Sequence, residues 1–460
     1  MVEAILERAW ALKQSVTDFV FDAEGELAEA LETYVADYLK RGNVPQDLIV
    51  DTFLIEGRIG DKTPLDLFEA DQSATLTDRD RQLLQQWQQT FTGLFVVETV
   101  SPDSIELMNW LTAKHYPVQL SQAQATADLT ARLKPGEIVL ARLAPITDAS
   151  TEAPIWMFST TFSLLGKLGK PKLAVAIGNF KEHHKPFLYA DAPDLLEEAW
   201  RSVERYHQAF VDFFGGDEVT LPGHQLNKKM DEFREFMLKR QFAEAGLEEP
   251  TSLGDLLVDV DLDEVDLDNA DLNEVAQSAG VDAQDLAQAL QQRGSKNSSD
   301  PGSNKMVVPT IQLPDHLKKA EQVTVLTHPR WGQIILPNYE KFKAVLASET
   351  GQTAANAEPL VRHYLDEPTI TPFVWQRLAQ HYPEALEQLL QTVLKRPDFE
   401  LEQDLASLLH DSGKPLEPEL PESASVPLHL HTLFEEAVKE VNKSKPKGKE
   451  KAKKAGFGAR

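Results

Sequence analysis

Alternating carboxylates are the first candidates for chemistry in this chain, because carboxylate oxygens are the ligands that calcium prefers. Asp259, Asp261 and Asp263 alternate within an unusually acidic stretch. A calcium loop of the EF-hand type also needs Gly at its sixth position and Glu at its twelfth, where this chain has Glu264 and Ala270. The pattern therefore favours a solvated acidic linker or partner-docking segment, with a weak cation site as an alternative.

The same stretch contains a short repeat. Residues 260–274 are three tandem copies of a five-residue unit and resemble the pentapeptide repeat, which forms a right-handed solenoid. A solenoid needs several stacked repeats before its core is buried. Three units are too few for a stable domain, so a solenoid fragment is a second alternative for this segment.

Residues 275–290 resemble the core of a helix-turn-helix, with Gly280 at the turn and apolar residues on the second helix. A DNA-reading helix directs cations toward phosphates and polar side chains toward bases. The second helix here carries Asp282 and Asp285 instead. We therefore expect two packed helices that do not bind DNA.

A glycine- and lysine-rich segment at 166–170 falls short of a phosphate-binding P-loop. Leu164 stands where the motif has its first Gly, and Pro171 stands where it has Ser or Thr. We interpret the segment as a flexible turn.

The histidines do not form a metal motif. His183 and His184 are adjacent and would point apart on a strand, whereas His429 and His431 would share a face, with Glu435 close to them. No third ligand follows at a recognisable spacing. Nucleophile-elbow and dinucleotide-binding fingerprints are also missing. We assign no catalytic, metal-binding or cofactor-binding residue and expect no cofactor. Whether the protein is an enzyme stays open, and these observations count against it.

The composition limits the classes of function. The 460 residues include no cysteine, which excludes disulfides and thiolate chemistry and predicts a reducing, cytoplasmic location. A formal net charge of −27 predicts repulsion of nucleic-acid phosphates and anionic lipids. No apolar run reaches the roughly 20 residues that cross a bilayer. We expect no integral membrane segment and partners that are other proteins, with nucleic acid disfavoured.

A change of hydrophobic period separates helices from strands in the first half of the chain. Helical spacing predicts two helices over 1–40 and one over 77–90, where Thr77 and Asp80 resemble a capping box. Five short strands with tight turns then suggest a small OB-like or SH3-like barrel. The period of two places these strands near 93–100, 104–111, 116–120, 137–146 and 154–160.

The second half is mainly helical. Amphipathic helices over 192–214 and 225–245 are expected to close the barrel unit. A Gly-, Ser- and Pro-bearing linker at 294–304 separates them from strands at 323–326 and 332–336. Further helices are expected near 338–348, 358–365, 372–394, 400–410 and 430–441.

These elements predict an α+β fold, with helices packed on a small barrel-like antiparallel β unit and a mainly α-helical second domain. They divide the chain into five regions: a helical region over 1–90, the barrel-like unit with two closing helices over 91–245, the acidic segment and flexible linker over 246–304, the mainly helical domain over 305–441 and a basic tail, expected to be disordered, over 442–460.

Three segments carry a resemblance to a known family: residues 51–68, 76–84 and 133–143. Together they are similar to a family of uncharacterised bacterial proteins, common in cyanobacteria, some of which end in a zinc-binding motif like that at the SecA C-terminus. That motif depends on cysteine, which this chain lacks. The resemblance therefore implies no zinc site here and brings no established activity.

The sequence favours a protein-interaction, scaffolding or assembly factor that uses hydrophobic grooves and the acidic central segment as docking elements. A nucleic-acid-associated factor that uses the barrel and the basic tail is the alternative. A small-molecule enzyme without a recognisable motif is the third candidate. These patterns determine neither the partner nor the oligomeric state.

Removal of residues 443–460 distinguishes the protein-interaction factor from the nucleic-acid-associated factor, because the tail carries eight Lys or Arg residues. We expect pull-downs with the truncated chain to recover the same partners as the full chain. Loss of every partner would favour the nucleic-acid-associated factor that uses the tail. Retention of the full chain on heparin at physiological salt would count against the interaction factor.

Overall fold

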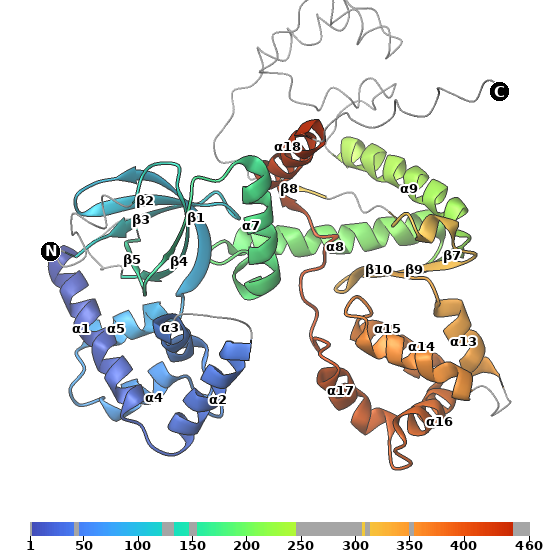
Figure 1. The fold of residues 1–460 in the computed structure, drawn as a ribbon, viewed down its shortest axis with the longest axis horizontal. Coiled ribbons are helices and arrows are strands. Elements are labelled where there is room, and N and C mark those ends of the chain that lie inside the picture. Colours follow the sequence, from blue (N-terminus) through green and yellow to red (C-terminus); the bar gives the residue numbers. More distant parts are fainter. Residues whose placement is uncertain are drawn as a thin grey trace, which may run out of the picture. The chain divides into compact units, whose positions relative to one another are not determined.

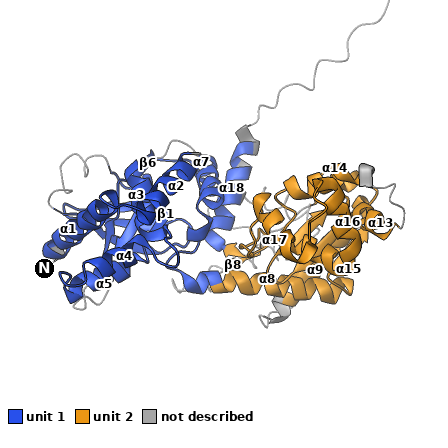
Figure 2. Cartoon of the chain, turned by 90° about the horizontal axis from the view of Figure 1, so that it is seen from below, with its two compact units in different colours: residues 1–196, 427–460 blue, residues 197–426 orange. Residues whose placement is uncertain are grey.

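The computed structural model describes residues 2–40, 46–121, 133–146, 154–244, 306–308, 313–348 and 354–444. The chain divides into two compact units, residues 1–196 with 427–460 (unit 1) and residues 197–426 (unit 2), coloured separately in Figure 2. The acidic repeat, the helix-turn-helix resemblance, the linker and nearly all of the basic tail lie outside the described residues. The expectations for them, and the five-region division, stay predictions.

Unit 1 begins with five helices in its described residues: α1 (Val2–Phe21), α2 (Glu26–Lys40), α3 (Gln46–Glu56), α4 (Pro64–Asp71) and α5 (Asp78–Trp87). The two helices expected over 1–40 are confirmed. A capping box opens both α4 and α5, with Thr63 and Thr77 as the N-cap residues. The box predicted at Thr77 and Asp80 is therefore present.

A closed β-barrel follows these helices (Figure 1). Its strands are β1 (Phe91–Val100), β2 (Ser104–Asn109), β3 (His115–Gln119), β4 (Ile138–Pro145) and β5 (Trp156–Phe158), with β6 (Ser163–Gly166) added beside β4. The order is β1-β2-β3-β5-β4, and pairing of β1 with β4 closes the ring. All pairs are antiparallel except β3 with β5. This Greek-key order favours the OB-like alternative.

Aromatic side chains fill the barrel interior. Trp156 packs edge to face against Phe91 and Tyr116, with ring centroids 5.6 and 5.2 Å apart. Phe95 packs against Tyr116 in the same way. All four rings are buried, so the barrel is a packed core rather than an open channel.

Helices cover the barrel on two faces. α1 and its neighbours share a hydrophobic core with Ala144, Ile146 and Met157. On another face, α7 (Lys170–His183) packs beside α18 (Leu428–Ser444) and covers Leu94 and Ile138 (Figure 1). A short 3₁₀ helix, η1 (Lys185–Phe187), follows α7. The barrel is thus the centre around which unit 1 is assembled.

Unit 2 joins a three-stranded antiparallel sheet to a helical layer. The sheet has the order β10-β9-β7. The elements in chain order are α8 (Pro193–Phe214), which starts in unit 1, β7 (Glu218–Leu221), α9 (Gly223–Glu244), β8 (Met306–Val307), η2 (Leu317–Lys319), β9 (Val323–His328), β10 (Gly332–Leu336), α13 (Tyr339–Ala347), α14 (Ala354–Asp366), α15 (Pro372–His381), α16 (Pro383–Leu394), α17 (Leu401–Asp411) and β11 (Val426–Pro427).

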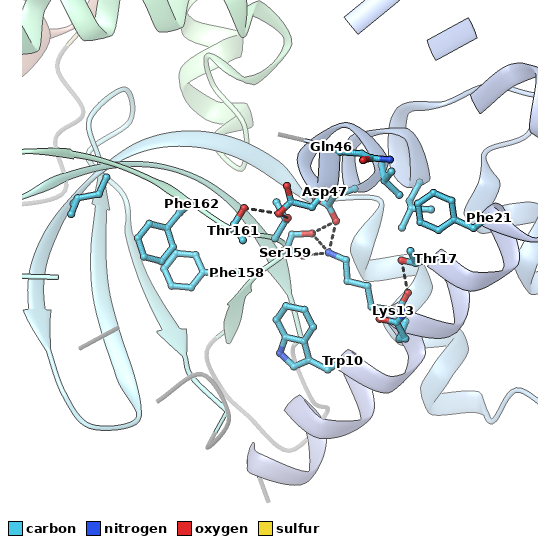
Figure 3. Close-up of a pocket in the computed structure, with 16 residues that line it drawn as sticks. Trp10, Lys13, Thr17, Phe21, Gln46, Asp47, Phe158, Ser159, Thr161 and Phe162 are labelled. Carbon is cyan, nitrogen blue, oxygen red and sulfur yellow. Dashed lines mark hydrogen bonds and ion pairs between the residues drawn. The ribbon is translucent and has the colours of Figure 1, made fainter. Parts of the chain in front are cut away.

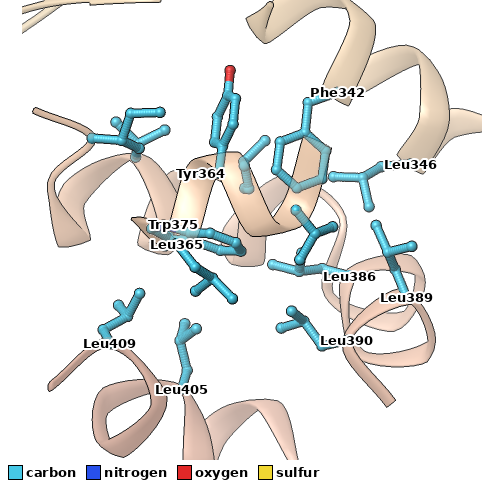
Figure 4. Close-up of a cluster of buried hydrophobic side chains, with 14 of the residues drawn as sticks. Phe342, Leu346, Tyr364, Leu365, Trp375, Leu386, Leu389, Leu390, Leu405 and Leu409 are labelled. Atoms are coloured by element: carbon cyan, nitrogen blue, oxygen red, sulfur yellow. The ribbon is translucent and has the colours of Figure 1, made fainter. Parts of the chain in front are cut away.

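The helices of unit 2 bury one large core, shown in Figure 4. Trp375 and Tyr364 lie against Phe342, whose ring meets both of theirs nearly at right angles. Leu386 and Leu390 of α16 continue the core toward α17. The α+β class and the mainly helical second domain are therefore both present. No helix in the described part of the chain combines the length and apolarity that a membrane span needs.

Two expectations about helices need correction. The helix expected over 372–394 is two helices, because the backbone leaves the helical region at Tyr382 and Pro383 begins α16. The helices expected to close the barrel, α8 and α9, instead bury Phe210 and Phe233 with Val325 of β9 in unit 2. An amphipathic pattern shows that a helix has an apolar face, but not which distant strand covers it.

Periodicity also missed short elements. β6 and β7 have only four residues each, too few to show alternation above chance. The segment at 166–170 is a strand-to-helix turn, in which Gly169 is the N-cap of α7. The predicted turn is present, and the helix that follows it was not expected.

Asp80 provides a test of how α5 is fixed to α1. Its buried carboxylate accepts two hydrogen bonds from Arg8, at 2.6 and 2.7 Å, and one from the Thr77 N–H. We expect Asp80→Ala to lower the free energy of unfolding by about 2 kcal/mol, measured by urea denaturation. The matched control is Asp78→Ala in the same helical turn, whose ion pair with Arg81 is exposed and contributes little.

The same variant has a defined pH dependence. The hydrogen bonds from Arg8 hold the pKa of Asp80 well below its usual range, despite the opposing effect of burial. A carboxyl with a lowered folded pKa stabilises the protein above its unfolded pKa of about 3.9, and that stability is lost as the pH falls. The difference between wild type and Asp80→Ala should shrink below about pH 4. A constant difference would contradict the assigned role.

Candidate functional site

A pocket of about 920 Å³ opens in unit 1 between α1, α3 and the segment that connects β5 to β6 (Figure 3). We call it the α1–α3 pocket. Its volume is toward the upper end of the range for ligand sites, about 300–1,000 Å³. The connecting segment contributes residues 158–162 and Leu164.

Helical spacing brings the lining side chains of α1 onto one face. Trp10, Gln14, Thr17 and Phe21 recur every three or four residues and line the pocket. A neighbouring face of the helix is buried in the unit 1 core. α3 lines the pocket in the same way, with residues from each successive turn: Gln46, Asp47, Val50, Asp51 and Leu54.

A buried ion pair forms the polar floor of the pocket. Lys13 of α1 contacts the Asp51 carboxylate of α3 and donates to both oxygens of Ser159, with Nζ 2.6 Å from Oγ. The Ser159 hydroxyl in turn donates to Asp51 Oδ1 at 2.9 Å. The side chains of Lys13 and Asp51 are only 12% and 3% exposed. The floor therefore joins both helices to the segment that follows β5.

Arg142 of β4 completes this floor from the barrel side. Its Nε lies 3.0 Å from Asp51 Oδ2, and its Nη1 lies 2.8 Å from Glu56 Oε1. Nη1 also lies 3.3 Å from the Thr92 hydroxyl. Because the Arg142 side chain is 1% exposed, its charge depends on these partners rather than on water.

The two cations set the protonation of Asp51. Burial raises the pKa of its carboxyl, but the charges of Lys13 and Arg142 outweigh that effect and hold the pKa below the ordinary value. Burial lowers the pKa of Lys13, and the negative charge of Asp51 partly offsets this effect. Lys13 has three acceptors for its three N–H groups, which is the geometry of an ammonium.

This geometry argues against a serine nucleophile. A Ser–Lys pair in catalysis needs a neutral amine that accepts the hydroxyl proton. Here the hydroxyl of Ser159 donates to Asp51, and Lys13 donates to Ser159. Ser159 is also only 2% exposed. The arrangement positions α1, α3 and the segment after β5, and it does not fit a Ser–Lys catalytic pair.

Asp47 places a carboxylate where the pocket opens. Its exposed side chain accepts hydrogen bonds from the hydroxyls of Thr161 and Thr160, at 2.6 and 3.3 Å. These contacts fix the carboxylate. Lys13 is the cation among the pocket-lining residues, and it is paired with Asp51 rather than with Asp47. The opening therefore favours a ligand with a positive charge or N–H donors.

The histidines considered from the sequence lie elsewhere. His183 ends α7 and donates to the Asn179 carbonyl, while His184 packs on Phe180. Burial lowers the pKa of His184 to about 4, with smaller effects of His183 and Arg142. His429 lies on α18, where its Nε2 is 2.8 Å from the Trp110 carbonyl. Acidic and histidine side chains form no metal-binding cluster within the described residues.

Sequence reasoning therefore missed the residues of the pocket. Lys13, Asp51 and Ser159 are far apart along the chain and belong to no motif. The sequence signal for the pocket was the presence of polar side chains among the apolar ones of α1 and α3. Many surface helices share this pattern. Comparisons with family models, curated proteins and solved structures found no match.

Asp51→Asn tests whether the floor holds the pocket together. The change leaves Lys13 and Arg142 with a neutral partner in a buried site, so we expect a loss of about 3–5 kcal/mol in unfolding free energy. Asp47→Asn on the same helix is the control, because Asp47 is exposed and should cost under about 1 kcal/mol. Chemical denaturation measures both.

The effect of Asp51→Asn should depend on pH. Since the folded pKa of Asp51 is lowered, its contribution is present above the unfolded pKa and lost as the pH falls through the folded value. Wild type and Asp51→Asn should therefore converge in stability below about pH 4. Equal stability of the two at pH 7 would show that the floor is not needed.

Proposed function

We propose that the protein is an interaction or assembly factor that binds a segment of a partner protein in the α1–α3 pocket. One observation carries this proposal: the pocket of about 920 Å³ has a floor whose buried ionisable groups, Lys13, Asp51 and Arg142, are already paired with one another. Such a site has binding capacity without a reactive group. The enzyme candidate is disfavoured for this reason.

The walls of the pocket are suited to apolar side chains. Trp10, Phe158 and Phe162 line it, and their rings lie around the opening in Figure 3. Phe21 is 53% exposed and Leu164 is 39% exposed, which is unusual for large apolar residues. Exposed apolar surface that continues into a pocket is typical of protein-binding sites.

Charge at the pocket supports a protein partner over a nucleic acid. Asp47 lines the opening, and Asp18 lies beside it because it accepts a hydrogen bond from the pocket residue Gln14 at 2.7 Å. These carboxylates repel phosphates. The absence of cysteine from the sequence supports a cytoplasmic location for this binding.

A pocket-filling substitution tests the proposal. Gln14 is exposed and lines the pocket, so the indole of Gln14→Trp would occupy space needed by a ligand. Ser15→Trp is the matched control, since Ser15 is exposed on the other side of α1. Tagged chains purified from the native host and analysed by quantitative mass spectrometry should show at least a tenfold loss of specific partners with Gln14→Trp only.

Thermal unfolding of both variants checks that the fold is intact. We expect melting temperatures close to that of the wild type, because both positions are exposed. Undiminished partner recovery by a correctly folded Gln14→Trp chain would contradict the proposed function.

A further inference from the structure

β6 is an edge strand that borders the α1–α3 pocket. In the described residues it pairs on one side only, with β4, through Leu164 opposite Val139 and Ser163 opposite Leu140. Half of the backbone N–H and C=O groups of a strand face each neighbour, so the outer edge of β6 can accept another strand. The strand has four residues, Ser-Leu-Leu-Gly, carries no charge or proline, and shifts register against β4 at Leu165.

The side chains of β6 connect this edge to the pocket. Leu164 lines the pocket, and Leu165, the residue at a register shift against β4, is 42% exposed. A strand added beside β6 would present every second side chain on the pocket face. A short edge supplies only a few hydrogen bonds, and the pocket supplies the apolar contact that such pairing needs.

Acidic side chains gather on the α1 and α3 side of the opening. Residues 14–39 of the sequence contain seven Asp or Glu and no Lys or Arg. They belong to α1 and α2 with the turn between them, and α1 is one wall of the pocket. Asp18 and Asp22 are exposed near Phe21, and Asp47 lies at the rim. Complementary charge therefore selects a cationic segment.

We infer that the partner segment is an extended strand bearing Lys or Arg residues, which pairs with the outer edge of β6 and places an apolar side chain in the α1–α3 pocket. The inference rests on the proposed function and specifies the chemistry and conformation of the ligand. Main-chain pairing provides affinity in this mode, and the pocket provides selectivity.

A random dodecapeptide library provides the first test. Peptides are selected on the full chain and counter-selected on the full-length Gln14→Trp chain, so that only pocket-dependent binders remain. The expected peptides combine Lys or Arg with β-branched or aromatic residues at alternate positions. Asp47→Asn should weaken them at least threefold and reduce their salt dependence. Enrichment of peptides with net negative charge would overturn the inference.

Backbone methylation of the best peptide tests the pairing directly. Two versions carry N-methyl groups at odd or at even positions, and their affinities are measured by fluorescence anisotropy. Residues in an added antiparallel strand alternately face β6 and face away. One version should therefore lose at least tenfold in affinity, while the other keeps it within about threefold.

The outcomes separate this inference from the proposed function. If pocket-dependent peptides bind equally well in both methylated forms, or are lost equally in both, the strand pairing is wrong and the binding function stands. If selection yields no peptide that distinguishes the wild-type chain from Gln14→Trp, both are overturned.

Discussion

The contact of Asp51 with Lys13 and Arg142 is the constraint on which the rest of unit 1 depends. Two cations and one carboxylate are buried together, and each would be costly without the others. The three side chains come from α3, α1 and β4, so the network sets the position of two helices on the barrel. The pocket between those helices exists because the network holds their spacing.

The same network decides what the pocket can do. Asp51 uses its oxygens on Lys13, Ser159 and Arg142, and Lys13 uses its three protons on Asp51 and Ser159. Groups satisfied in this way stabilise a shape and are poorly suited to exchange protons with a substrate. The apolar walls then interact with a ligand, and the carboxylate of Asp47 provides the exposed charge. The proposed binding role rests on this division of roles.

The barrel topology places an edge next to that surface. β4 pairs with β1 along one side, and with β5 and β6 in succession along the other. Closure through β1 removes the edges of the main ring, as in other small barrels, while β6 pairs only with β4 among the residues that the structure describes. Because the chain from β5 to β6 also lines the pocket, backbone pairing and side-chain contact are available at one place.

Local sequence patterns were enough to predict the capping box at Thr77, the first two helices and the five barrel strands, because spacing and caps act over a few residues. Only the tertiary structure decided which strand α8 and α9 cover and which side chains meet Asp51. Ser159 lies 108 residues beyond Asp51, and Arg142 lies 91 residues beyond it. Contacts over such separations depend on how the barrel closes, and no local period records that closure.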